Sequence, residues 1–149
     1  MSNSLAEKLM KLDRGDLTAA KRLEVRVDTL SEKLGEDVYV TLRSLPGSEY
    51  AEYGSMTQNK KGGIDTAKAY DVQALMVAES IEGIDVKDPE LQKHFGAATP
   101  KDLVKILFPG GELTKMSNYI GYLSGYLTAE DIGLEDTGEL GLEYKDVKN

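Results

Sequence analysis

The residues best suited to catalysis lie in one stretch, HFGAATPKDLVKILFPGGEL, at positions 94–113. It contains His94, the single histidine of the chain, and a histidine can act as a general acid or base near neutral pH. The chain has no cysteine and no second histidine, and no motif supplies a carboxylate or lysine partner. His94 falls in the last turn of an expected helix, where an imidazole interacts favourably with unpaired carbonyl groups. We therefore expect no catalytic residue.

Glycine pairs and carboxylates are the remaining features that could hold a cofactor or a metal. The pairs in KKGGID and FPGGELTK match neither the P-loop pattern nor the glycine pattern of dinucleotide-binding folds. In the acidic C-terminal stretch, glycine never falls at the sixth position after suitably spaced Asp or Asn residues, so a calcium loop is not predicted. We expect no cofactor, no metal site and no enzymatic activity.

A tyrosine-rich stretch, NYIGYLSGYL at positions 118–127, is one candidate for a partner-binding surface. Its spacing places four side chains on one face of a helix: Tyr119, Tyr122, Leu123 and Tyr126. Tyrosine is frequent at protein interfaces because its apolar ring ends in a hydroxyl. Packing on the chain's own core is the main interpretation of this face, and binding of a partner or of a second copy is the alternative.

The N-terminal segment is another candidate surface, because Leu5, Leu9 and Leu12 have helical spacing. The sequence DRGDL then interrupts the pattern. So short a helix is marginal by itself in water. It either packs on its own domain, which is the main interpretation, or forms an arm over residues 1–16 that becomes ordered against a partner or a second copy.

The elements that must position these surfaces begin with two strands. Apolar residues alternate with polar ones in two stretches, at Leu23, Val25 and Val27 and again at Val38, Val40 and Leu42. The intervening SEKLGED predicts a turn, so we expect an antiparallel hairpin. A lone hairpin is marginally stable, so helices or a strand of another chain must cover it.

The chain after the hairpin is expected to be helical. A helix is predicted to start near Pro46, and an apolar stripe predicts a central helix over residues 66–81. Two shorter helices each follow a capping residue and a proline, at Asp88-Pro89 and Thr99-Pro100. Gly96 is expected to end the first of these. In the second, the side chains expected to face the core are Leu103, Val104, Ile106 and Leu107. A last helix is expected over residues 112–126.

Composition limits the domain count and the kinds of partner. A chain of 149 residues suits one domain, and its net charge of −8 argues against a nucleic-acid partner. No apolar run reaches the roughly 18 residues that span a membrane. Past Leu127, seven acids stand against two bases, which predicts a flexible acidic tail over residues 128–149. We expect a predominantly helical α+β domain over residues 1–127, with an N-terminal antiparallel β-hairpin.

The order of these features carries a family resemblance. A hairpin reading SEKLGEDVYVTLRSL precedes a helical part with FGAATPKDLVKILFPGGEL and then LSGY. This arrangement resembles the XkdN-like phage tail assembly chaperones of Gram-positive phages and prophages. The similarity runs from Leu9 to Tyr126 and is strongest over residues 30–45 and 95–113. The LPGE of that family stands here as FPGGE, with Gly111 added, and the tail is longer than is typical.

The resemblance implies a non-enzymatic protein of the host bacterial cytoplasm. It implies that the chain coats the tape-measure protein and keeps it soluble while the tail tube assembles. Contact with the tail tube protein, or formation of a homo-oligomer, would extend this function, whereas nucleic acid and membrane are not expected partners. Two other functions stay open from the residues: a structural virion component such as a tail completion protein, and a small acidic regulator that binds a host protein.

Overall fold

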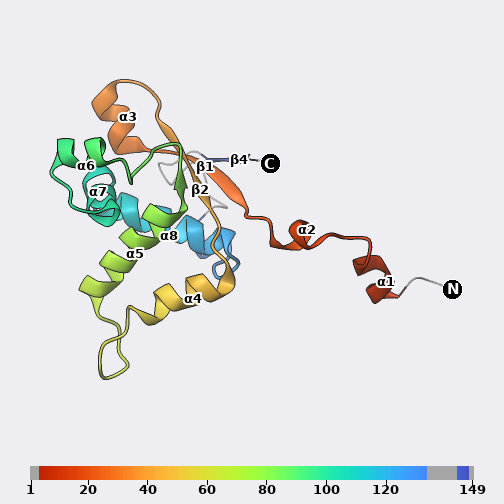
Figure 1. The fold of residues 1–149 in the computed structure, drawn as a ribbon. Coiled ribbons are helices and arrows are strands. Elements are labelled where there is room, and N and C mark those ends of the chain that lie inside the picture. The colour runs from red at the N-terminus through yellow and green to blue at the C-terminus, as the bar shows by residue number, and fades with distance from the viewer. Residues whose placement is uncertain (1–3, 134–143, 148–149) are drawn as a thin grey trace.

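The structure of the protein is a computed structural model that describes residues 4–133 and 144–147. It is an α+β fold in which helices pack on a small antiparallel sheet with strand order β3-β2-β1-β4 (Figure 1). The strands are β1 (Arg22–Arg26), β2 (Tyr39–Arg43), β3 (Ile81–Glu82) and β4 (Tyr144–Val147). The expected fold class is therefore confirmed, including the antiparallel pairing of the two N-terminal strands.

The hairpin has the register that its apolar pattern requires. Leu23 lies opposite Leu42 and Val25 lies opposite Val40, so each strand turns one apolar face to the core.

The link between these strands differs from the expected turn, because Asp28–Leu34 forms a helix, α3. Gly35 ends α3 in the left-handed conformation, with φ of +71°. The buried hydroxyl of Ser31 accepts a hydrogen bond from the Val38 N–H at 2.8 Å, which returns the chain to β2. The chain therefore crosses between the strands as a capped helix.

Helices form the rest of the domain, close to their expected positions. They are α4 (Gly47–Ser55), α5 (Thr66–Ser80), α6 (Pro89–Phe95), α7 (Pro100–Leu107) and α8 (Gly111–Leu123). Asp88 caps α6 by accepting from the Glu90 N–H at 2.9 Å, and Thr99 caps α7 by accepting from the Asp102 N–H at 3.1 Å. Gly96 has a φ of +70° and ends α6, as its position predicts.

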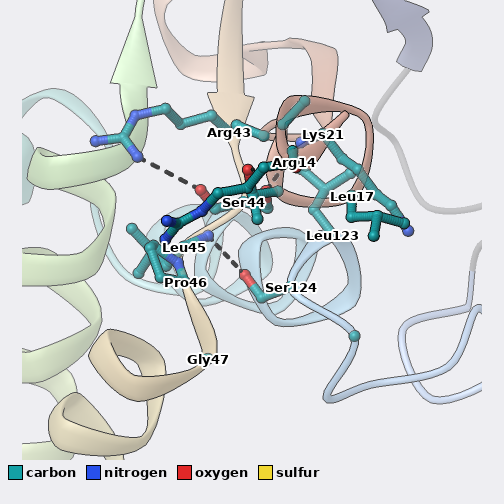
Figure 2. Close-up of a pocket in the computed structure, with 14 residues that line it drawn as sticks. Arg14, Leu17, Lys21, Arg43, Ser44, Leu45, Pro46, Gly47, Leu123 and Ser124 are labelled. Carbon is teal, nitrogen blue, oxygen red and sulfur yellow. Dashed lines mark hydrogen bonds between the residues drawn. The ribbon is translucent and has the colours of Figure 1, made fainter. Parts of the chain in front are cut away.

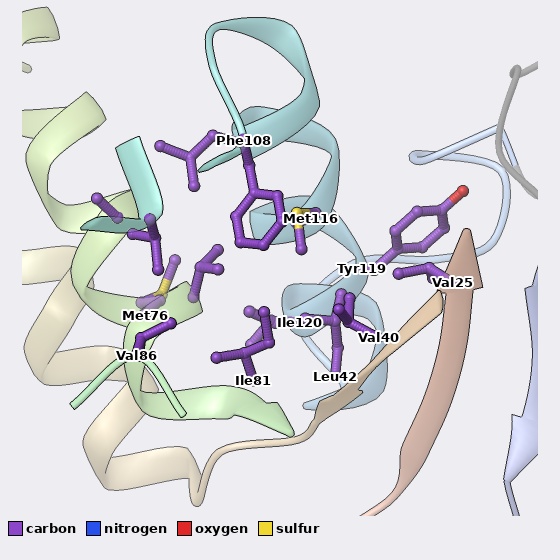
Figure 3. Close-up of a cluster of buried hydrophobic side chains, with 14 of the residues drawn as sticks. Val25, Val40, Leu42, Met76, Ile81, Val86, Phe108, Met116, Tyr119 and Ile120 are labelled. Atoms are coloured by element: carbon purple, nitrogen blue, oxygen red, sulfur yellow. The ribbon is translucent and has the colours of Figure 1, made fainter. Parts of the chain in front are cut away.

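The core lies between the sheet and three helices. α5 contacts α7 and α8, while α8 also contacts β1 and β2. Figure 3 shows the buried Phe108 beside Met116 of α8, and Tyr119 near Val25 of β1. Ile106 corrects the expectation for α7, because it is 46% exposed. This short helix buries one narrow face, made by Leu103, Val104 and Leu107.

The chain beyond α8 returns to the domain at two places. Ala129 and Ile132 pack partly against the core, and Tyr144–Val147 pairs with β1 as strand β4. These two parts of the expected flexible tail are therefore in contact with the folded domain. The rest of that tail, residues 134–143 and 148–149, lies outside the described residues.

The N-terminal segment extends away from the sheet (Figure 1). It contains two short helices, α1 (Leu5–Leu9) and α2 (Arg14–Thr18), and neither has a buried residue. Within residues 4–133 and 144–147, no side chain of these two helices is buried on the domain, which differs from the main interpretation of this segment. Throughout the described residues, no helix combines the length and the apolarity needed to cross a bilayer.

Candidate partner-binding surface

Short-range hydrogen bonds hold the N-terminal arm, defined here as residues 4–18. Ser4 Oγ accepts from the Glu7 N–H at 3.2 Å at the start of α1, and Asp16 Oδ2 accepts from the Asp13 N–H at 2.7 Å at the start of α2. Among the described residues, the hydrogen bonds of the arm join arm residues to one another, except that the Gly15 carbonyl oxygen accepts from the N–H of Ala19, the residue that follows the arm. The arm is therefore locally ordered while its side chains remain accessible.

The apolar side chains of the arm face solvent. Leu5 is 71% exposed, and Leu9 and Leu12 are each 45% exposed. Met10 and Leu17 are exposed as well, so the arm presents apolar side chains along its whole length. Clustered exposed apolar side chains mark interaction sites, because a single exposed leucine is ordinary but a contiguous group is not.

The predicted tyrosine face does not form one exposed surface. Tyr119 and Leu123 are buried in the core, and Tyr122 packs partly against it. Tyr126 lies beyond the end of α8 and is 50% exposed. The helix stops at Leu123 because Gly125 takes a φ of +86°, a conformation that glycine readily adopts. The side chains therefore divide between the core and a separate turn.

A groove with a volume of about 600 Å³ lies where the arm joins the domain (Figure 2). Its walls come from α2, the start of β1, the end of β2 and the C-terminal end of α8. Leu45 and Leu123, both buried, supply apolar surface at its base, and Leu17 of α2 stands exposed at its side. This groove, termed the arm-root groove below, adjoins the apolar arm.

Two serine hydroxyls fix the walls of the arm-root groove. Ser44 Oγ accepts from the Lys21 N–H at 2.9 Å, which joins the end of β2 to the start of β1. Ser124 Oγ accepts from the Leu45 N–H at 2.9 Å, which joins β2 to the end of α8. The groove is thus held by contacts between segments that are far apart in the sequence.

The side chains around the arm-root groove carry positive charge. Its lining includes Arg14, Lys21 and Arg43 and no acidic residue. Arg43 is already engaged, because its Nη2 donates to the Glu79 carbonyl oxygen at 3.0 Å and lies 3.4 Å from a Glu79 carboxylate oxygen. Arg14 and Lys21 have no ion pair within the described part of the chain.

Sequence reasoning missed this groove because its lining comes from four separate segments. One local signal for α2 is present in the sequence. Asp13 and Asp16 are three residues apart and form the start of this helix, although DRGDL was expected only to end the preceding helix. The basic side chains gave no signal, since Arg14, Lys21 and Arg43 are scattered among acids along the chain.

The residue considered for catalysis, His94, lies on the surface of the domain. His94 is exposed in the last turn of α6, where its ring packs edge-on against Phe95 with centroids 4.8 Å apart. No group of three or more histidines and carboxylates in the described ranges is placed to hold a metal ion. The accessible features in these ranges are an apolar arm and a basic groove, which suit the binding of another protein.

An exposed apolar arm marks a surface that binds another protein, and the comparisons with known proteins give the family. The model of the phage XkdN-like tail assembly chaperone proteins matches residues 7–139, so the chain belongs to this family. The resemblance noted in the sequence is confirmed, and the role of the protein lies in phage tail assembly.

A solved structure supports the fold independently. The crystal structure of the protein yqbn, a structural genomics target, superposes with a TM-score of 0.57 at 18% sequence identity. The match covers 85% of this chain and 100% of that chain. At this identity the similarity concerns the fold alone. Among curated proteins, no match is found.

Proposed function

We propose that this protein binds the tape-measure protein during tail assembly and keeps it soluble until the tail tube encloses it. The protein acts in the host cytoplasm and without catalysis. The observation that carries the proposal is the N-terminal arm, in which Leu5, Leu9 and Leu12 are exposed although the rest of the domain has a well-packed core. Family membership supplies the setting.

The physical reason for this binding is that the arm and the tape-measure protein both expose apolar surface. A long helical tape-measure protein exposes apolar stripes before the tube surrounds it, and such stripes aggregate unless another protein covers them. Full burial of one exposed leucine contributes about 1.5–3 kcal/mol, so burying the surface that Leu5, Leu9 and Leu12 still expose supplies about 2–5 kcal/mol before the costs of ordering and association. Each copy therefore binds modestly, which suits a coat that tube subunits must later displace.

The charge of the chain serves the same function. A net charge of −8 keeps a complex of many copies soluble, because like-charged surfaces resist further association. Exposed apolar residues on the arm then bind one target without causing general aggregation.

Co-expression with the tape-measure protein of the same phage tests the proposal. We expect affinity capture of this protein to recover soluble tape-measure protein, with several copies per tape measure by light scattering. Tape-measure protein expressed alone should sediment. If it sediments equally in both cultures and is never captured, the proposal is wrong. Light scattering of this protein alone then shows whether the arm instead joins two copies, and capture with tail tube protein tests that second partner.

A further inference from the structure

We propose that the arm-root groove receives an acidic, leucine-bearing helical segment of the tape-measure protein. This inference rests on the proposed function and adds the chemistry of the recognised segment. It assigns two parts to the interface: the arm contributes apolar contacts, and the groove selects for carboxylates.

Charge gives the first reason. The chain has 26 acidic and 18 basic side chains, yet the groove is lined by three basic residues and no acidic one. Arg14 and Lys21 form no ion pair with the described residues, so their charges are available to a partner. Carboxylates are the protein groups that pair with guanidinium and ammonium ions, and Arg14 can bind one through two parallel N–H groups.

The shape and lining of the groove give the second reason. A volume of about 600 Å³ accommodates several side chains, more than a single ion requires. Leu17 is 69% exposed at the edge, while Leu45 and Leu123 offer apolar surface below it. Figure 2 shows Arg14 extended across the groove in front of Leu45 and Pro46. An occupant must therefore combine apolar side chains with carboxylates.

Continuity with the arm gives the third reason. Arg14 and Leu17 belong to α2, so they are part of the arm and also line the groove. Because α2 follows the leucines of α1 in the chain, a long helix bound to the arm can also contact Arg14 and Leu17 at the groove. Such a helix carries leucines on the face toward the arm, and carboxylates where it passes Arg14 and Lys21.

The test uses overlapping 20-residue peptides that tile the tape-measure sequence, probed with the full-length protein. We expect the bound peptides to be net acidic and rich in leucine, and their affinity to fall at least tenfold between 50 mM and 500 mM salt, because exposed charge pairs are screened. Intact tape-measure protein is captured in parallel. If it is captured but the bound peptides are neutral or basic, this inference is overturned while the proposed function stands. If it is not captured, both are overturned.

A matched pair of variants locates the charge. Arg14→Gln with Lys21→Gln removes the two unpaired cations of the groove and should weaken binding of the acidic peptides at least fivefold. Lys60→Gln with Lys61→Gln removes two cations from the exposed loop before α5 and should change binding less than twofold. Both variants should melt at the wild-type temperature by circular dichroism. Equal binding by the two variants would overturn the assignment of the groove.

Discussion

The ring of Tyr126 stacks on the ring of Tyr50, with centroids 4.3 Å apart and planes inclined by 18°. The Tyr126 hydroxyl donates a hydrogen bond to the Gly47 carbonyl oxygen at 3.0 Å. These contacts join α4 to the turn that follows α8, across 79 residues of sequence. Tyr126, which its spacing places on a candidate binding face, therefore connects α4 to the turn after α8.

Loss of the Tyr126 ring should destabilise the domain. Tyr126→Ala removes a stacked pair and a hydrogen bond, each typically contributing about 0.5–1.5 kcal/mol, so we expect the free energy of unfolding to fall by about 1–3 kcal/mol. Tyr126→Phe keeps the ring and should cost about 0.5–1 kcal/mol. Urea unfolding measures both. A Tyr126→Ala variant as stable as the wild type would show that the stacking contributes nothing in solution.

Gly121 should resist replacement, because α4 and the chain after α8 approach it closely. A Cβ atom there would lie 2.7 Å from Tyr50 Oη and 2.9 Å from Leu127 Cδ1. Gly121→Ala should therefore lower the free energy of unfolding by about 1 kcal/mol, since overpacking outweighs the gain in helix propensity.

Gly54 in α4 is the matched control for that substitution. A Cβ atom there meets nothing within 4 Å, so Gly54→Ala should raise stability by up to about 1 kcal/mol. Thermal unfolding of the two variants side by side gives the comparison. A Gly121→Ala variant stabilised as much as Gly54→Ala would contradict the close approach.

Glu112 links two helices through its carboxylate. It lies in the first turn of α8, and its Oε2 accepts from the Thr29 N–H in the first turn of α3 at 3.2 Å. Glu112→Ala leaves that N–H without its partner and should cost about 1–3 kcal/mol. Glu90→Ala is the control, because it removes an exposed carboxylate from the first turn of α6 without breaking such a link. Equal costs for the two variants in urea unfolding would refute the role of Thr29.

Two partly buried tyrosines predict a loss of stability at alkaline pH. Burial raises the pKa of Tyr50, with a smaller contribution from Tyr126, and burial together with nearby carboxylates raises the pKa of Tyr53. Both groups are neutral in the folded and unfolded chain well below pH 10, so their contribution is constant there. Above the unfolded pKa, ionisation favours the unfolded chain, and stability falls as pH rises through the folded pKa.

Urea unfolding at several pH values between 8 and 11 measures this loss. The double variant Tyr50→Phe with Tyr53→Phe should show a shallower decline above pH 10 than the wild type. Identical declines would mean that other groups account for the alkaline effect.

Local chemistry explains which parts of the fold were predictable from sequence. The ends of α6 and α7 were correct because Asp88, Pro89, Gly96, Thr99 and Pro100 act on the backbone within a few residues of themselves. The pairing of β1 with β2 followed from a period of two, which places every apolar side chain on one face.

Features that depend on distant contacts were missed. The composition of SEKLGED predicts a turn where α3 forms, and the contact of the buried Ser31 with Val38 is visible only in three dimensions. β3 has two residues, too few for alternation to appear. The tyrosine face divided because Gly125 ends the helical path before Tyr126, although the spacing continues.

The candidate surfaces also depend partly on local patterns and partly on distant contacts. The spacing of the leucines in the arm predicts a helix from the sequence alone. Whether those leucines pack on the domain depends on the direction in which the arm extends. The basic groove required four segments to meet, which no local pattern records.

The measurement that tests the central proposal most directly is the solubility of tape-measure protein co-expressed with an arm variant. Leu5→Ser, Leu9→Ser and Leu12→Ser together remove the exposed leucines of the arm, while Leu34→Ser, Ile64→Ser and Ile106→Ser remove three exposed apolar side chains elsewhere. We expect the arm variant to fold normally and to leave the tape-measure protein in the pellet, and the control variant to keep it soluble. Soluble tape-measure protein with the arm variant would show that the arm is not its binding surface.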